Sequence, residues 1–173
     1  AIVQARMGST RYPNKVMQPI CGTPMIGLLL ERLSKAKLID QIVLATSLHI
    51  CNEPLVEYVR ELGYEVHRGS EDDVLDRFYT AANFYNADVM VRITGDCPLT
   101  DPELVDRVIE KFEETNADYV TNTAPPTHPD GLDVEVFKFE VLEAAWKEAK
   151  EGYEREHVTP YIRETSKFKT INI

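Results

Sequence analysis

The sequence predicts an α/β fold in which helices cover both faces of a mostly parallel sheet. Short apolar runs alternate with amphipathic stretches along most of the 173 residues, and this alternation is typical of strand–helix–strand units that pair in parallel. The helical stretches repeat apolar residues at intervals of three and four, whereas the strand runs are short. Ligands bind such sheets at the carboxyl ends of the strands, so the loops that follow strands are the expected sites of function.

The alternation is clearest over the first two thirds of the chain. Short apolar runs predict strands at residues 2–5, 42–46, 65–67 and 89–93. Amphipathic stretches predict helices at residues 25–38, 53–62, 73–85 and 102–114. Asp101 and Pro102 are typical of a helix start, Gly63 is typical of a helix end, and Ser70 or Asp72 is expected to cap the third helix.

The pattern weakens after Tyr119, where prolines interrupt it. Residues 121–131 are predicted as a loop, 132–139 and 169–173 as strands, 141–150 as a helix, and 154–163 as a helix interrupted at Pro160. The length fits one domain.

Composition narrows the function classes. The formal charge of −10 and the pI of about 4.9 argue against a nucleic-acid binder, although a nucleotide bound with Mg²⁺ is compatible with an acidic chain. No apolar run is long enough to span a membrane, and no secretory signal is visible. The three cysteines form no CxxC, so reduced thiols in a cytoplasmic protein are expected.

The loop after the first predicted strand gathers cations. Arg6, Arg11 and Lys15 surround residues 8–10, and Pro13 stiffens the approach to the lysine. Backbone N–H groups and cations at a strand end suit a triphosphate. The segment is neither a Walker loop nor Gly-x-Gly-x-x-Gly, so a solvated turn remains the alternative.

A second polar loop follows the strand at residues 89–93. Gly95 allows a close backbone approach there, and Asp96 offers a hard oxygen ligand of the kind Mg²⁺ uses together with substrate phosphates. The alternative interpretation is a structural turn aspartate ahead of Pro98.

Two later segments carry further polar groups. Asp133 and Glu135 are expected on one face of a strand, where they would hold sugar hydroxyls or a metal, or would simply be solvated. His157 is either a proton carrier or a hydrogen-bonded structural histidine. Arg77 either points toward the ligand cleft or pairs with Asp73.

Together and in this order, these motifs resemble the cytidylyltransferases of the acylneuraminate and 3-deoxy-manno-octulosonate group, and among them the spore coat polysaccharide biosynthesis protein F branch. The matching segments cover nearly the whole chain: residues 4–11 with Pro13 and Lys15, 68–77, 92–99, 129–136 and 155–161.

The resemblance implies a Rossmann-like nucleotide-diphospho-sugar transferase fold that uses CTP and Mg²⁺. A sugar hydroxyl would attack the α-phosphate and release pyrophosphate, activating the sugar for cell-surface polysaccharide synthesis. The expected nucleotide-binding residues are Gln4, Ala5, Arg6, Met7, Gly8, Ser9, Arg11, Lys15, Arg77 and Thr94. Asp96 is the expected metal ligand, and it is expected to be catalytic together with Arg11 and Lys15. The expected sugar-binding residues are Asp130, Gly131, Asp133, Glu135, Glu156 and His157.

The chain departs from the family pattern at its end. In the family that the chain resembles, a second metal-binding Asp usually follows the strand that closes this chain. It is absent here, so residues 1–173 are expected to be a single nucleotidyltransferase domain that lacks its C-terminal segment, with an incomplete second metal site as the alternative. The sugar, the choice of CTP over another triphosphate and a homodimeric state remain open, and neither nucleic acid nor membrane is expected as a partner. A glycosyltransferase is the alternative enzyme, but residues 94–96 lack the first Asp of its usual Asp-x-Asp motif. A non-catalytic nucleotide-binding domain is the other alternative.

Overall fold

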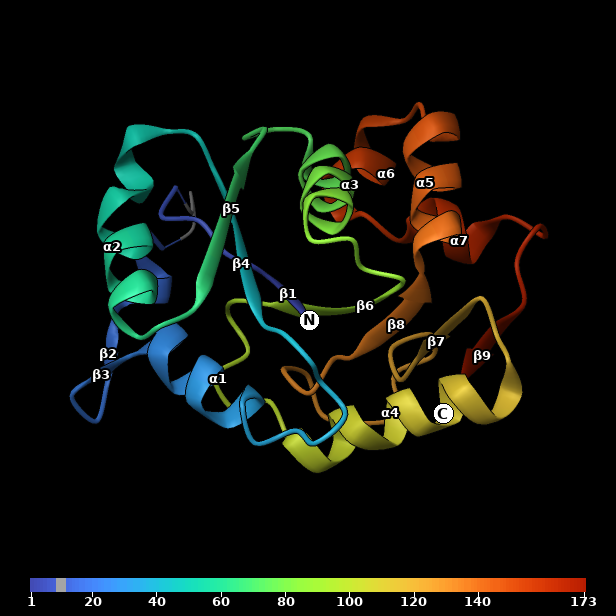
Figure 1. Cartoon of the computed structure of the whole chain (residues 1–173), viewed down its shortest axis with the longest axis horizontal. Helices are drawn as coiled ribbons and strands as arrows, with labels where there is room; N and C mark the ends of the chain where they lie inside the picture. Colours follow the sequence, from blue (N-terminus) through green and yellow to red (C-terminus); the bar gives the residue numbers. More distant parts are fainter. Residues whose placement is uncertain (9–11) are drawn as a thin grey trace.

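A computed structural model describes residues 1–8 and 12–173, and over these residues the chain forms a seven-stranded sheet (Figure 1). Its strands are β1 (Ile2–Gln4), β4 (Val43–Ser47), β5 (Glu65–Gly69), β6 (Val89–Thr94), β7 (Tyr119–Thr121), β8 (Glu135–Lys138) and β9 (Thr170–Asn172). They lie in the order β5-β4-β1-β6-β8-β7-β9. Only β8 of these strands runs antiparallel to its neighbours, which confirms the mostly parallel sheet.

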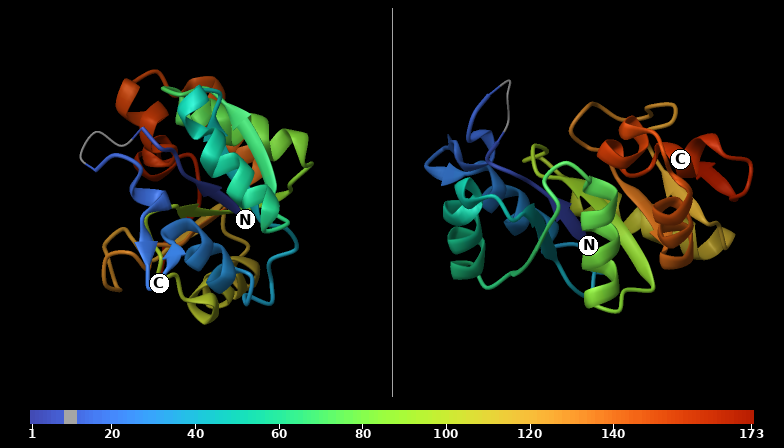
Figure 2. Two further views of the ribbon diagram at one scale, coloured as in Figure 1. Left: turned by 90° about the vertical axis from the view of Figure 1, so that its left-hand side faces the viewer. Right: turned by 90° about the horizontal axis from the view of Figure 1, so that it is seen from above.

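Helices cover both faces of this sheet, as predicted (Figures 1 and 2). They are α1 (Met25–Leu33), α2 (Glu53–Glu61), α3 (Val74–Phe84), α4 (Pro102–Thr115), α5 (Phe139–Glu148), α6 (Gly152–His157) and α7 (Pro160–Glu164). Successive strand residues point to opposite faces. Val3 and Leu44 therefore pack with α1, α2 and α4, whereas Ile2 and Ala45 pack with α3, α5 and α7.

Two predicted elements are shorter than expected because side chains take their backbone hydrogen bonds. The first helix was expected to reach residue 38, but the Asp106 carboxylate accepts the N–H groups of Lys37 and Leu38, which leave the helix. The strand expected from residue 132 begins at Glu135, because the side chain of Asn122 accepts the Val134 N–H at 2.9 Å.

Several short elements were not predicted. They are η1 (Lys15–Met17), the β2 (Pro19–Ile20) and β3 (Thr23–Pro24) hairpin, η2 (Ile50–Asn52), and β7, whose last residue fell in the predicted loop. Asp73 rather than Ser70 or Asp72 caps α3, since its Oδ1 accepts the Asp76 N–H at 2.9 Å. The predicted Asp101 cap of α4 is confirmed, with the Glu103 N–H at 2.9 Å.

Gly95 brings the loops after β1 and β6 together. Its N–H donates to the Gln4 carbonyl at 2.8 Å. A Cβ at this position would lie 2.6 Å from the Ala5 Cβ, closer than carbon atoms pack. Asp96 is consequently held beside the loop that follows the central strand.

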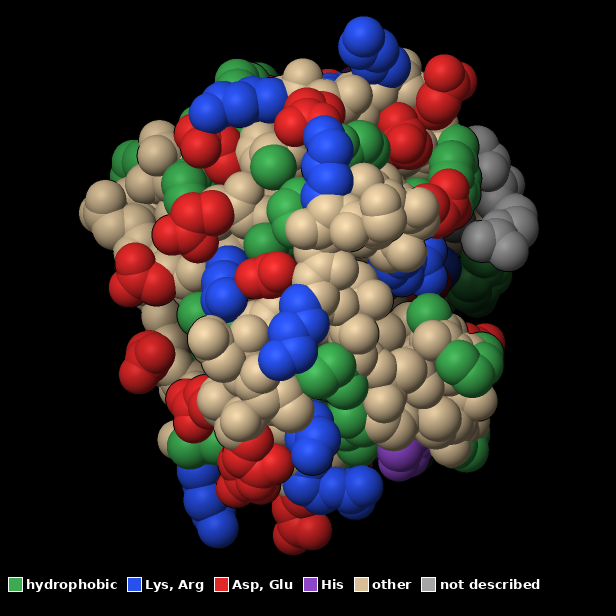
Figure 3. All heavy atoms as spheres, turned by 90° about the vertical axis from the view of Figure 1, so that its right-hand side faces the viewer, with side chains coloured by type: hydrophobic (Ala, Val, Ile, Leu, Met, Phe, Trp, Pro, Cys, Tyr) green, Lys and Arg blue, Asp and Glu red, His purple; other side chains and the backbone are tan. Residues whose placement is uncertain are grey.

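The surface carries both signs of charge. On the face shown in Figure 3, acidic and basic side chains are interspersed. Among the described residues, no helix is long and apolar enough to cross a bilayer.

Candidate functional site

The candidate site is centred on an ion pair between residues far apart in the sequence. Val16 is buried and anchors η1, and the Asn14 N–H donates to the Met7 carbonyl at 3.1 Å, which closes the loop after β1. Lys15, the first residue of η1, is thereby directed across the strand ends. Its Nζ lies 2.5 Å from Oδ2 of Asp96.

Asp96 is held in its charged form. Burial by itself would raise the pKa of this carboxyl, but the hydrogen bond and charge of Lys15, with a further hydrogen bond from Thr94, hold the pKa below its usual value. The Lys15 ammonium therefore marks a position beside the Asp96 carboxylate at which a cation is stabilised. Among the described residues no group of three or more acidic, His or Cys side chains could hold a metal unaided, so a metal at Asp96 would need ligands from a substrate.

A cavity of about 790 Å³ opens beside this ion pair. Its walls come from the loop after β1, the loop after β6 and the segment before β8: Tyr12, Lys15, Thr94, Asp96, Cys97, Pro98, Leu99, Pro129, Asp130, Gly131, Leu132 and Asp133. The volume lies within the usual range for small-molecule sites. Another cavity, of about 440 Å³, opens at the opposite edge of the sheet near the amino ends of β1 and β6, away from the loops in which parallel sheets bind ligands.

A smaller cavity of about 330 Å³ adjoins the larger one. Thr94 and Asp133 line both cavities, so a molecule in one would face a molecule in the other. The smaller cavity is also lined by Arg92, Thr123, Glu135, Tyr153, His157, Thr159 and Arg163.

A buried ion pair forms one wall of the smaller cavity. Glu135 pairs with Arg92 through Oε2, and its Oε1 accepts hydrogen bonds from Tyr119 at 2.5 Å and Thr159 at 2.7 Å. Burial would raise the pKa of Glu135, but the Arg92 charge and these hydrogen bonds lower it below the usual value. Arg92 also donates from Nε to the Gln4 side chain at 3.0 Å. Glu135 thus orders Arg92, whereas sequence analysis expected it to hold sugar hydroxyls.

Asp133 faces both cavities from a different setting. It precedes β8, and it lies on the same side as Glu135, as the alternation predicted. Burial raises its pKa, and the nearby Asp130 and Glu135 carboxylates raise it further. A hydroxyl donor or a cation beside Asp133 would offset this repulsion.

The predicted sugar-binding residues are divided between the two cavities. Asp130 and Gly131 line the larger cavity, together with Lys15 and Asp96. His157 lines the smaller one, with its ring 5.5 Å from that of Tyr153. Glu156 is exposed and lines neither cavity.

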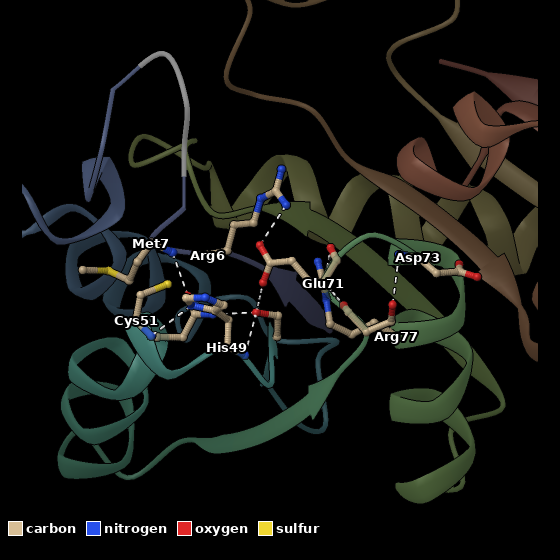
Figure 4. Close-up of polar contacts among 10 residues, drawn as sticks. Arg6, Met7, His49, Cys51, Glu71, Asp73 and Arg77 are labelled. Atoms are coloured by element: carbon tan, nitrogen blue, oxygen red, sulfur yellow. Dashed lines mark hydrogen bonds and ion pairs between the residues drawn. The ribbon is translucent and has the colours of Figure 1, made fainter.

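The first residues of the loop after β1 are held by neighbouring loops (Figure 4). Arg6 pairs with Glu71 at 3.0 Å, and the Met7 N–H donates to Asn52 at 2.8 Å. Ala5 is buried and Gly8 is exposed. Ser9 and Arg11, which the sequence assigned to the nucleotide, lie outside the described residues.

Arg77 lies elsewhere than the sequence suggested. Its side chain is buried, lines neither cavity and makes no ion pair with Asp73. Its guanidinium donates instead to the carbonyl oxygens of Ser70 and Glu71. Arg155 is the partner of Asp73, at 2.6 Å.

Sequence analysis missed Ser47, Asn52, Glu71 and Arg163. Ser47 is the last residue of β4, and Asn52 and Glu71 follow β4 and β5. Ligands are expected at the carboxyl ends of strands, so the argument that pointed to Arg6 and Asp96 also applies to these three residues. Arg163 follows no strand, and no local pattern indicates that α7 reaches the smaller cavity.

Comparison with known proteins agrees with this geometry. Residues 1–171 match the sequence profile of the family described as Cytidylyltransferase. The protein MJ1063 of Methanocaldococcus jannaschii is 51% identical over 163 residues, which cover 94% of this chain and 66% of that protein. The spore coat polysaccharide biosynthesis protein SpsF of Bacillus subtilis is 36% identical over 167 residues, which cover 94% of this chain and 68% of SpsF.

A solved structure extends the agreement to three dimensions. A cytidylyltransferase from Leptospira borgpetersenii superposes with a TM-score of 0.95 at 36% identity, over 99% of this chain and 74% of that one. The chain thus spans about two thirds of the length of MJ1063 and SpsF. The family resemblance drawn from the sequence motifs is confirmed, and the chain belongs to the cytidylyltransferase family.

Proposed function

We propose that this chain forms the nucleotide-binding part of an enzyme that transfers a cytidylyl group from CTP to a sugar hydroxyl and releases pyrophosphate. The observation that carries the proposal is the Lys15–Asp96 pair at the mouth of the larger cavity. An ammonium and a carboxylate side by side at the carboxyl ends of β1 and β6 provide one partner for phosphate oxygens and one for a cation.

The triphosphate would bind along the loop after β1. Arg6 and Lys15 supply positive charge there, and Arg11, outside the described residues, is proposed as a third cation. Contacts of this kind act by positioning the phosphates and by stabilising charge that develops on the departing pyrophosphate.

Asp96 would hold Mg²⁺ together with phosphate oxygens, since Mg²⁺ is commonly bound by one or two carboxylates and substrate phosphates. When bound, the ion neutralises phosphate charge and polarises the α-phosphate. Asp96 is suited to this role because Lys15 and Thr94 keep it ionised, and because it lies at the cavity rather than in the core.

The sugar would occupy the smaller cavity and reach the α-phosphate where Thr94 and Asp133 line both cavities. Asp133 and His157 are proposed to contact the hydroxyl groups of the sugar. Arg92, which the ion pair with Glu135 orients, is proposed to contact them as well. Because SpsF is named for spore coat polysaccharide synthesis, a sugar destined for a surface polysaccharide is the proposed acceptor.

The test is pyrophosphate release from a panel of ribonucleoside triphosphates and sugars, with and without Mg²⁺. Release with CTP that requires Mg²⁺ and one class of sugar is expected. The Asp96→Asn variant, which keeps the shape of the side chain, should abolish turnover without unfolding the chain. Mg²⁺-dependent turnover by that variant at the wild-type rate would contradict the assignment of Asp96, and release with another triphosphate alone would contradict the choice of CTP.

A further inference from the structure

Glu71 is the centre of a hydrogen-bond network that contacts the loop after β1 from outside the two cavities. This loop is the proposed triphosphate-binding segment and is called the phosphate loop below. Its Oε1 pairs with Nη1 of Arg6 at 3.0 Å, and its Oε2 accepts a hydrogen bond from Ser47. Ser47 in turn accepts from the Asn52 amide at 2.6 Å, and the Asn52 oxygen accepts the Met7 N–H at 2.8 Å. The network therefore starts at the backbone of Met7 and returns to the side chain of Arg6, its neighbour in the chain.

The inner part of this network cannot move easily. Ser47 and Asn52 are fully buried, so each loses its bonding partner if the other shifts. The backbone of Glu71 is also fixed, because the buried Arg77 guanidinium donates to the carbonyl oxygens of Ser70 and Glu71. Glu71 is thus held from two sides, and Arg6, whose side chain is 39% exposed, is the more exposed member of the pair.

Among the described residues, the Arg6 guanidinium donates to Glu71 alone. The pair uses Nη1, and in Figure 4 the other terminal nitrogen of the guanidinium points away from Glu71. An arginine with one edge fixed by a carboxylate and another edge exposed is oriented for an oxygen anion at little further cost in side-chain entropy.

We infer that Glu71 is a positioning residue for the phosphate loop, acting through Arg6; the inference rests on the proposed function. Glu71 stays charged, because hydrogen bonds from Ser47 and Arg6 and the charges of Arg6 and Arg77 outweigh the effect of burial and lower its pKa. Repulsion between this carboxylate and a triphosphate would oppose binding. Removing the Glu71 charge should therefore weaken CTP binding if Glu71 positions Arg6, and should strengthen CTP binding if the repulsion dominates.

The experiment is a double-mutant cycle on CTP affinity, measured by calorimetry with Mg²⁺. Glu71→Gln keeps the shape and removes the charge, and it is expected to weaken CTP binding about tenfold, since an Arg6 side chain that is no longer held must lose its conformational entropy when CTP binds. In the Arg6→Ala background the same Glu71→Gln change should have little further effect. The sugar KM should stay unchanged in Glu71→Gln.

The matched control is Glu53→Gln. Glu53 pairs with Arg68 at 2.5 Å, with 38% of its side chain exposed against 33% for Glu71, and it makes no contact with Arg6. Its CTP affinity should equal that of the wild type, and thermal unfolding of each variant shows whether the fold is retained.

Three results would overturn the inference. These are a CTP affinity that rises in Glu71→Gln, an affinity that does not change, and a loss of equal size with and without Arg6. Inorganic triphosphate serves as a second probe: a wild-type chain that binds neither it nor CTP would overturn the proposed function as well, whereas wild-type binding with an unaffected Glu71→Gln variant would overturn this inference alone.

Discussion

Replacing Glu135 by Gln tests whether the buried ion pair in the wall of the smaller cavity behaves as its geometry implies. Exposed fractions of the two side chains are 12% for Arg92 and 6% for Glu135. The amide of a glutamine has one acceptor oxygen, so it can accept from Arg92 or from Tyr119 and Thr159, but not from both sides. In either arrangement the largely buried Arg92 guanidinium loses the carboxylate with which it pairs.

The magnitude follows from the burial. Breaking a buried pair by removing one charge costs about 3–5 kcal/mol, which is a large part of the roughly 5–15 kcal/mol that stabilises a domain. With a urea m-value of about 2 kcal/mol per M, the unfolding midpoint should fall by about 1.5–2.5 M. Fluorescence of Trp146, the only tryptophan, can follow the transition.

The effect should also depend on pH. The pKa of Glu135 is lowered in the folded chain, so its contribution to stability is present above its ordinary pKa near 4.5 and is lost as the pH falls through the folded value. The free energies of unfolding of the wild type and of Glu135→Gln should therefore become more similar as the pH falls.

Two further variants sharpen this test. Glu31→Gln breaks an exposed pair with Lys35, whose side chains are 65% and 61% exposed, and should change stability by about 0.5 kcal/mol or less. The double variant Arg92→Met, Glu135→Leu should be more stable than Glu135→Gln, because no charge is left buried. A loss below about 1 kcal/mol in Glu135→Gln at neutral pH would refute the reasoning.

Three other outcomes are expected. Lys15→Met should change the free energy of unfolding by less than about 1 kcal/mol, because the Lys15–Asp96 pair is partly exposed. The same change should weaken CTP binding at least about tenfold through loss of a charge-assisted contact. A CTP affinity equal to that of the wild type, measured by calorimetry, would refute this. Gly95→Ala should cost about 1–3 kcal/mol, because the added Cβ meets the Ala5 Cβ at 2.6 Å, and an unchanged melting temperature would show that the loops can separate freely. Asp101→Ala should lower stability by about 1 kcal/mol through loss of the α4 cap while turnover stays normal, and slower turnover in a folded variant would give Asp101 a role that its position does not indicate.

Local patterns predicted most of the fold. The alternation of apolar runs and amphipathic stretches was enough for the parallel sheet and its two helical layers, and Asp101 marked its helix start correctly. Features that depend on distant residues were missed. The first helix stops early because Asp106 takes the N–H groups of Lys37 and Leu38, and β8 starts late because Asn122 replaces a strand partner.

The same distinction applies to the site. The strand-end rule pointed to Lys15 and Asp96, which lie in contact. It could not tell that Glu135 would be neutralised by Arg92, because the pairing of β6 with β8 sets those two residues opposite each other. The role of Glu71 was hidden for a related reason, since its partners Arg6 and Ser47 come from distant parts of the sequence.

The affinity for CTP with and without Mg²⁺, measured for the wild type and for Asp96→Asn, tests the central claim most directly, because it needs no knowledge of the sugar. If Asp96 and the phosphates share the ion, Mg²⁺ should strengthen CTP binding to the wild type by about tenfold or more and should have little effect on the variant. Asp96→Asn also frees Lys15 from its ion pair, so binding of CTP without Mg²⁺ should be kept. An equal Mg²⁺ effect in both proteins, or no CTP binding to the wild type, would contradict the account.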